Sequence, residues 1–180
     1  MRLIGGFFFA VLLLGGFITR PGGGLASPSG SGGDSRNHSS QVAAAPSDVM
    51  AAVSESLAAD GLEIVSRADD GVRLRAVIAS TALSGDPEFA PLSRYGDMII
   101  TARVGASDAE VTAGFAMKET AAHYRITAAP AGDGKGSIVT MEASVEEGSG
   151  RDSRRVARGL RTVIDRSGRN LLDRVTAAAG

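Results

Sequence analysis

The chain has 180 residues, a formal net charge of −1 at pH 7 and no cysteine. This length suits one domain of ordinary size. The lack of cysteine excludes disulfides, thiolate metal sites, a cysteine nucleophile and a lipid attached through an N-terminal cysteine. A hydrophobic content of 43% with only 4% aromatic residues predicts an aliphatic core. The charge is uneven, because residues 46–147 carry sixteen Asp and Glu against eight Lys and Arg, whereas residues 151–174 carry eight Arg against three Asp.

The N-terminal segment is predicted to direct export. Arg2 precedes an apolar run over residues 3–18, which is shorter than the roughly 20 residues that a membrane-spanning helix needs. Gly24 and Ala26 suit a signal-peptidase cut before Ser27. We therefore expect residues 1–26 to be a signal peptide, with an uncleaved anchor as the alternative. Either form places the rest of the chain in the periplasm or outside the cell.

Residues 27–46 are rich in Ser, Gly and Ala. Such a segment buries too little apolar surface to offset its conformational entropy, so a flexible linker is predicted. His38 lies within it and is expected to have no role, because a metal site needs several ligands held together.

A single folded domain is predicted over residues 47–178. Ser47 suits the N-cap of a short amphipathic helix that ends at Gly61. Strands at 62–67 and 72–78 flank Asp70-Gly71, a pair of residues typical of a tight hairpin turn. Residues 79–96 contain two prolines and no periodicity, and we expect a long loop there.

Four further segments alternate apolar and polar residues with period two, at 97–104, 109–117, 121–129 and 137–145. This alternation is typical of an antiparallel meander with one polar face. With the hairpin, it predicts a sheet of about six strands. The polar face is expected to carry Glu63, Arg73, Arg75, Arg103, Glu110, Thr112, His123, Arg125, Thr140 and Glu142.

Residues 151–175 are predicted to form a long helix across the apolar face of this sheet. Its apolar stripe consists of Val156, Leu160, Val163, Ile164, Leu171, Leu172 and Val175, at spacings of three and four. Gly159 and Gly168 interrupt it, which predicts either a close approach of helix backbone to sheet or two shorter helices. The expected fold is α+β, with an antiparallel sheet packed on one face by a short N-terminal helix and a long C-terminal helix.

The arginines of this helix have two interpretations. One is a solvated helix face with Arg–Asp pairs, such as Asp165 with Arg161 and Arg169. The other is a surface for an anionic partner, whether lipid headgroups, a polyanion or an acidic subunit. The candidate residues are Arg151, Arg154, Arg155, Arg158, Arg161 and Arg169.

No catalytic, cofactor-binding or metal-ligating set is predicted. His123 is expected to be a surface residue, because no G-x-S-x-G motif or other local triad motif accompanies it. The GDGKG stretch at 132–136 is interpreted as a hairpin turn, since phosphate-binding loops join a strand to a helix. Nucleic acid is not expected as a partner, because the arginine-rich helix has no aromatic residue for base stacking.

Two stretches resemble known families. SDVMAAVSESLAADGLEIVSRADDGVRLRA is similar in rhythm to the opening of BamC-type outer-membrane assembly lipoprotein domains. HYRITAAPAGDGKGSIVTMEASV with the following helix resembles the closing half of START/Bet v 1-like lipid-binding domains. Both resemblances imply a helix-grip-like arrangement, in which a sheet curls around the last helix, and neither implies site residues. A START-like domain would also have a strand before its first helix, and no such strand is predicted.

Two functions follow as the main hypotheses, and an enzyme whose carboxylates come together only in space is a third. The first is a non-enzymatic exported domain that acts through protein or envelope contacts. The alternative is a binder of a hydrophobic small molecule or lipid between the sheet and the C-terminal helix, with the 79–96 loop as a lid. Small residues on the apolar face would leave room for such a ligand; they are Ala102, Ala113, Ala128 and Ala143.

Overall fold

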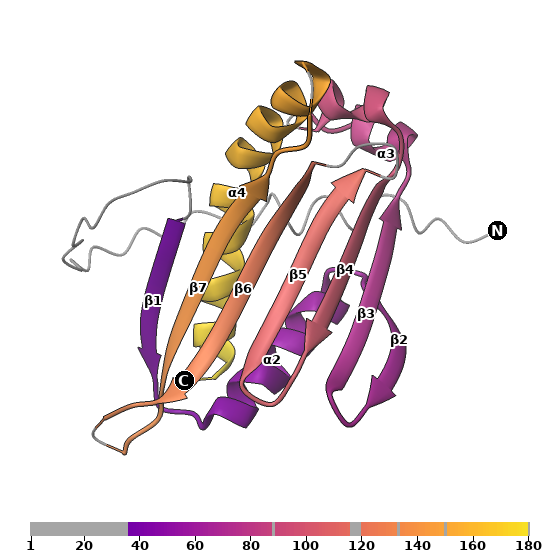
Figure 1. Cartoon of the computed structure of the whole chain (residues 1–180). Helices are drawn as coiled ribbons and strands as arrows, with labels where there is room; N and C mark the ends of the chain where they lie inside the picture. The colour runs from indigo at the N-terminus through magenta and orange to yellow at the C-terminus, as the bar shows by residue number, and fades with distance from the viewer. Residues whose placement is uncertain (1–35, 88, 116–119, 133, 150, 180) are drawn as a thin grey trace.

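A computed structural model describes residues 36–87, 89–115, 120–132, 134–149 and 151–179, without the side chains of Arg36 and of residues 162–168. Helices pack on one face of a seven-stranded antiparallel sheet (Figure 1). The strands are β1 Arg36–Val42, β2 Glu63–Ala68, β3 Gly71–Ile78, β4 Met98–Val104, β5 Asp108–Phe115, β6 Ala121–Pro130 and β7 Ser137–Glu146. The helices are α2 Pro46–Ala59, α3 Ser80–Ser84, the 3₁₀ helix η1 Ala90–Tyr95 and α4 Arg151–Ala178. The predicted α+β class is confirmed.

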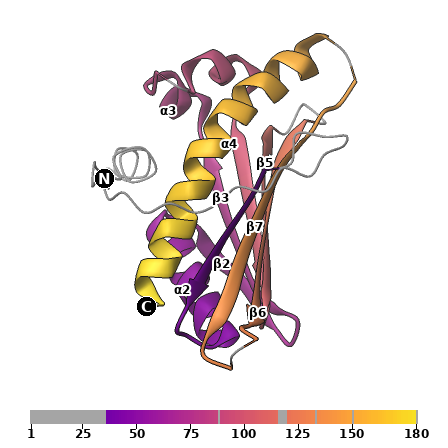
Figure 2. The ribbon, with the colours of Figure 1, turned by 90° about the vertical axis from the view of Figure 1, so that its left-hand side faces the viewer.

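The sheet has the order β1-β7-β6-β5-β4-β3-β2. Strands β2 to β7 form a meander, in which each strand pairs antiparallel with the next along the chain. These are the six predicted strands. The helices cover one face of the sheet, here called the inner face, and leave the other, the outer face, uncovered (Figure 2). Successive side chains of a strand point to the two faces in turn.

The seventh strand, β1, differs from the prediction. The sequence indicates a flexible linker over residues 27–46, but residues 36–42 pair with β7, with His38 opposite Met141 and Val42 opposite Ser137. Sheet pairing uses backbone groups, so a polar segment can join the open edge of β7 without an apolar pattern of its own. This strand stands before the first helix, where the START-like pattern requires one. Residues 1–26 and the first part of the linker lie outside the described residues.

The junction between β1 and α2 is anchored on the β6–β7 turn. The buried Ser137 hydroxyl donates a hydrogen bond of 2.7 Å to the carbonyl of Ala44. Gly136 has a φ of 87°, and a Cβ there would lie 1.9 Å from the Val42 carbonyl oxygen, so only glycine fits. Helix α2 then begins at Pro46 with Ala45 as N-cap. The prediction of Ser47 as N-cap was therefore wrong, because proline suits the first helical position.

Helix α4 is one continuous helix, not two, and crosses the inner face diagonally (Figure 2). Its predicted apolar stripe is buried wherever side chains are described, at Val156, Leu160, Leu171, Leu172 and Val175. Val163 and Ile164 lie outside the described side chains. The predicted packing of this helix on the sheet is confirmed.

Candidate functional site

The inner face is covered by two separate apolar clusters. One joins α2 and the C-terminal half of α4 to the sheet, through residues such as Val53, Leu57 and Leu172. The other joins the sheet to the N-terminal half of α4 and to α3 with η1, here called the cap, through residues such as Leu83 and Leu160. Figure 2 shows α2 and the cap near opposite ends of α4. The middle of the inner face therefore lies between two centres of packing.

Three successive rows of paired residues on β3, β4 and β5 cross this region. They are Ile78, Met98 and Phe115 nearest the cap, Ala76, Ile100 and Ala113 in the middle, and Leu74, Ala102 and Val111 nearest α2. All members of the two outer rows are buried, at 8% exposure or less. All three members of the middle row are partly exposed. We call the middle row, together with the partly exposed Tyr124 on β6, the mid-face band.

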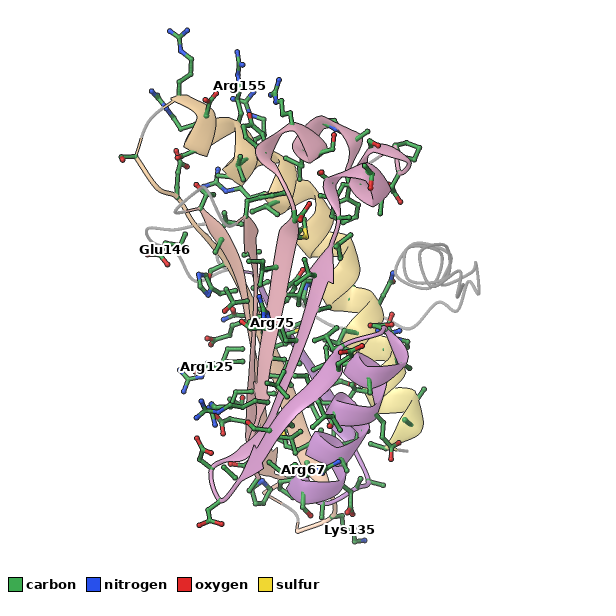
Figure 3. The ribbon with its side chains drawn as sticks, turned by 90° about the vertical axis from the view of Figure 1, so that its right-hand side faces the viewer. Arg67, Arg75, Arg125, Lys135, Glu146 and Arg155 are labelled. Carbon is green, nitrogen blue, oxygen red and sulfur yellow. The ribbon has the colours of Figure 1, made fainter. Side chains whose placement is uncertain are left out.

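The mid-face band is accessible from the side of β3. Helix α4 packs on β7, β6 and β1, and Ala122 of β6, which pairs with Ala113, is 1% exposed. The partly exposed residues Ala76, Ile100 and Ala113 therefore lie on the β3 side of the strands on which α4 mainly packs. Figure 3 views the molecule from this side.

The cap is fixed to both α4 and the sheet. Leu83, Phe89 and Leu92 are buried, and the Tyr95 ring meets the Phe115 ring edge-on, with centroids 6.2 Å apart. The Asp97 carboxylate accepts a hydrogen bond of 2.8 Å from the Ser80 backbone N–H, which closes the segment at its base. The segment predicted as a long loop thus contains the two short helices α3 and η1, which pack over one end of the inner face.

The four alanines predicted to line a cavity all lie on the inner face. Ala102, Ala128 and Ala143 are buried in the apolar clusters, at 6%, 4% and 4% exposure. Ala113 alone of the four belongs to the mid-face band. Ala76, Ile100 and Tyr124 were not singled out from the sequence, because alternation identifies the inner face but not which of its rows the helices leave partly open.

The six candidate arginines do not form one cluster. Arg151, Arg154, Arg155 and Arg158 are exposed on the first two turns of α4. Arg161 is directed to Glu147, at 3.4 Å. Arg169 is exposed but lies about 27 Å along the helix from Arg151, at 1.5 Å per residue. The predicted pairing of Asp165 lies outside the described side chains.

One arginine of α4 has a structural role. Arg174 donates two hydrogen bonds of 2.6 Å to the two carboxylate oxygens of Asp60, just after α2. The Asp60 side chain is 6% exposed and that of Arg174 is 33% exposed. The hydrogen bonds to Asp60 raise the pKa of Arg174, against the opposing effect of burial. The pair joins α2 to the C-terminal end of α4.

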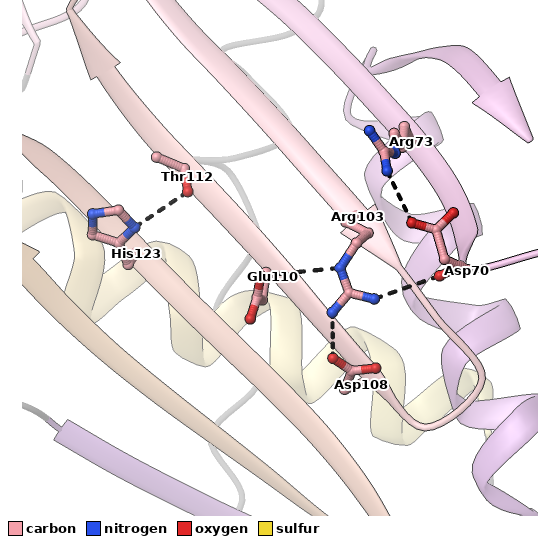
Figure 4. A network of polar contacts seen from close by, with 7 residues as sticks. All are labelled: Asp70, Arg73, Arg103, Asp108, Glu110, Thr112 and His123. Atoms are coloured by element: carbon pink, nitrogen blue, oxygen red, sulfur yellow. Dashed lines mark hydrogen bonds and ion pairs between the residues drawn. The ribbon is translucent and has the colours of Figure 1, made fainter. Parts of the chain in front are cut away.

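Some of the polar residues predicted for the outer face make side-chain contacts there (Figure 4). Arg103 is bonded to Asp108 and lies 4.0 Å from Glu110, and the hydrogen bond to Asp108 raises its pKa. Arg73 donates to Asp70 at 2.9 Å, and this hydrogen bond lowers the pKa of the Asp70 carboxyl. These contacts lie at the surface, some of them partly buried, and each contributes little to stability.

A hydroxyl, an imidazole and a carboxylate also line up on the outer face. His123 Nδ1 lies 3.2 Å from Thr112 Oγ1, and its Nε2 lies 3.3 Å from Glu146 Oε2. A nucleophilic triad needs such neighbours, but also backbone donors for the oxyanion and cover from water. Glu146 is 74% exposed, and β5, which carries Thr112, is paired with a strand on both sides. We therefore assign this set to the polar surface of the sheet.

The described part of the chain has neither a metal site nor a membrane-spanning helix. No group of three or more His, Asp or Glu side chains there is arranged to hold a metal ion. No helix there is long and apolar enough to span a membrane.

No protein-family model and no curated protein matches the chain. Solved structures are similar in shape at low identity. A START superfamily protein from Mycobacterium smegmatis is 16% identical, with a TM-score of 0.47, over 78% of this chain and 96% of that chain. Ara h 8.0201 is 10% identical, with a TM-score of 0.45, over 82% of this chain and 98% of that chain. TTHA0849 from Thermus thermophilus is 14% identical, with a TM-score of 0.47, over 81% of this chain and 99% of that chain.

A START superfamily protein is thus among the similar structures. The resemblance to BamC-type domains finds no support in these comparisons. The similarity concerns shape alone and assigns no residue a role.

Proposed function

We propose that this protein binds an apolar small molecule against the mid-face band, between α2 and the cap. The observation that carries the proposal is the three-row comparison, in which Ala76, Ile100 and Ala113 are partly exposed between two fully buried rows. The helices that cover the flanking parts of the sheet, α2 on one side and the cap on the other, give the band apolar walls, and α4 packs on the sheet beyond, at β6 and β7.

The chemistry of the band indicates the class of ligand. Its row consists of two alanines and an isoleucine, so a ligand that covers it replaces water on aliphatic surface, which gains roughly 25 cal/mol per Å². Small side chains in two of the three positions leave space above the sheet that larger residues would fill. The ligand class that fits is an aliphatic or aromatic compound, such as an acyl chain.

An alanine-to-leucine pair tests this proposal. Ala113→Leu fills the band, whereas Ala129→Leu adds the same side chain to an exposed position of the sheet. We expect N-phenyl-1-naphthylamine to bind the parent protein and Ala129→Leu with enhanced fluorescence, and to bind Ala113→Leu at least tenfold more weakly. Thermal unfolding confirms that each variant is folded, and Ala76→Leu replaces Ala113→Leu if the latter is not.

Two results would contradict the binding proposal. One is equal binding of the probe by Ala113→Leu and Ala129→Leu. The other is native mass spectrometry of protein from its own cells that detects no co-purifying apolar compound, together with no binding of the probe by the parent protein.

We propose further that the domain is exported and non-enzymatic and acts through contacts in the cell envelope. The N-terminal apolar run and the small residues before Ser27 support export. The intact mass of the protein recovered from cells tests it, with a chain that begins at Ser27 as the expected result. Turnover of an ester, glycoside or phosphate that is lost on substitution of His123 or of a defined acid would contradict the non-enzymatic role.

A further inference from the structure

The first two turns of α4 present a positively charged surface at one end of the molecule. Arg151, Arg154, Arg155 and Arg158, here called the arginine face, are all exposed. At 100° per residue they fall within an arc of about 100° on the helix. The buried side chains of these turns lie on the opposite side, at Ser153, Val156, Ala157 and Leu160. Figure 3 shows Arg155 projecting from this end of the molecule, away from the sheet.

In the described part of the chain, Arg158 makes an internal contact, but the other three arginines of this face do not. Within the described residues, no hydrogen bond or ion pair engages the guanidinium groups of Arg151, Arg154 or Arg155. The neighbouring Arg161 differs, since it is directed to Glu147 at 3.4 Å. The exposed Asp152 lies on the flank of the arc, about 60° beyond Arg155. The centre of the surface therefore carries charge of one sign.

The rest of the domain has the opposite charge. Residues 46–147 hold sixteen Asp and Glu against eight Lys and Arg, so the body of the protein is acidic and one end of α4 is basic. Such an asymmetry orients a protein before contact with a charged surface. An anionic surface would attract the arginine face and repel the remainder.

The residues of the arginine face fit a lipid surface better than a protein or a nucleic acid. A stable protein interface needs a buried apolar or aromatic centre, and the exposed large hydrophobic residues of the described chain are Ile64, Val65, Val77 and Ile138, none of them on α4. Single-stranded nucleic acid needs aromatic stacking, and α4 has no aromatic residue. A lipid surface needs only charge, because its headgroups adjust to the positions of the arginines.

We propose that the arginine face docks the protein on a membrane surface that contains anionic phospholipids. Each arginine near such a surface contributes roughly a fivefold gain in binding, so Arg151, Arg154 and Arg155 together give a gain of about a hundredfold at low ionic strength. This proposal does not depend on the ligand of the mid-face band, since the two surfaces lie on different elements and are tested separately.

Two charge-matched variants of the full chain test the docking. The first carries R151Q, R154Q, R155Q and R158Q. The second carries R67Q, R75Q, R125Q and K135Q, which remove the same total charge from exposed positions on the sheet and the β6–β7 turn (Figure 3). Sedimentation with phosphatidylcholine vesicles, with and without about 30% phosphatidylglycerol, measures binding. Binding to the neutral vesicles measures any contribution of the N-terminal apolar segment, and it is subtracted from binding to the anionic vesicles.

We expect the parent protein and the sheet variant to prefer anionic vesicles, and the α4 variant to lose about a hundredfold in that preference. At about 0.5 M salt, where screening is strong, all three proteins should bind alike. Equal losses in both variants would show that net charge alone matters and would overturn the proposal. So would binding of heparin or nucleic acid through the arginine face without any preference for anionic vesicles.

Discussion

At the scale of single residues, the Asp60–Arg174 pair is the clearest case of a charge that the fold requires. Two hydrogen bonds of 2.6 Å join Arg174 to a carboxylate whose side chain is only 6% exposed. A buried charge that loses its partner costs more than the pair contributes, because the remaining group keeps its desolvation penalty. This pair holds α2 and the end of α4 at a fixed separation beside the apolar cluster that the two helices share.

Asp60→Asn should therefore lower the free energy of unfolding by about 2–4 kcal/mol, somewhat less than for a fully buried pair because Arg174 keeps solvent contact. Urea unfolding measures the change. Asp173→Asn, an exposed aspartate on α4, is the control and should change stability by less than about 0.5 kcal/mol. Similar small effects of both substitutions would show that the Asp60–Arg174 pair does not stabilise the fold.

At the scale of elements, the position of the cap depends on one glycine of α4. A Cβ at Gly159 would lie 2.7 Å from Cδ2 of Leu92, the buried leucine of η1. The sequence predicts a close approach at Gly159, but to the sheet, whereas the structure brings the cap to this point. Glycine at this position lowers the stability of the helix by about 1 kcal/mol relative to alanine. Because glycine has no side chain, η1 can pack directly on the helix backbone.

Gly159→Ala should have opposite effects in two backgrounds. In the parent protein we expect a loss of about 1 kcal/mol in the free energy of unfolding, since the strain against Leu92 exceeds the gain in helix propensity. In Leu92→Ala the same substitution should instead gain about 1 kcal/mol, because the space is open and only propensity remains. Chemical unfolding of the four proteins measures both changes. A change of the same sign and size in both backgrounds would exclude this contact.

At the scale of the whole molecule, one long helix serves three regions. Its C-terminal half packs with α2, its N-terminal half packs with the cap, and its first turns carry the arginine face. The mid-face band lies where neither α2 nor the cap covers the sheet completely. An apolar compound bound there would touch residues at the edges of both clusters, since Ile100 and Tyr124 pack against both.

Such a compound should stabilise the whole domain. At a concentration about 100 times its Kd, a ligand adds about 2.7 kcal/mol to the free energy of unfolding, which for a domain of this size raises Tm by about 5–10 °C. We expect this shift with N-phenyl-1-naphthylamine in the parent protein and in Ala129→Leu. At the same probe concentration, differential scanning calorimetry should find at most about half of this shift in Ala113→Leu, because tenfold weaker binding adds only about 1.4 kcal/mol. An equal shift there would place the probe elsewhere.

The sequence by itself determined the elements and their faces. The Asp70-Gly71 turn identifies the hairpin of β2 and β3. Alternation with period two identifies strands β4 to β7 and assigns Arg103, Glu110 and His123 to the outer face, and spacings of three and four identify the buried stripe of α4. These features follow from local periodicity, because the spacing of apolar residues decides whether a strand or a helix can place them all on one buried face.

Only the tertiary structure decided what happens where elements meet. Strand β1 forms because β7 offers an open edge of backbone groups, which side-chain patterns do not report. The partial exposure of Ala76 and Ile100, the contact of Gly159 with Leu92 and the Asp60–Arg174 pair all depend on residues far apart in the chain. Periodicity specifies the direction in which a side chain points, whereas the distance at which two elements pack specifies what that side chain touches.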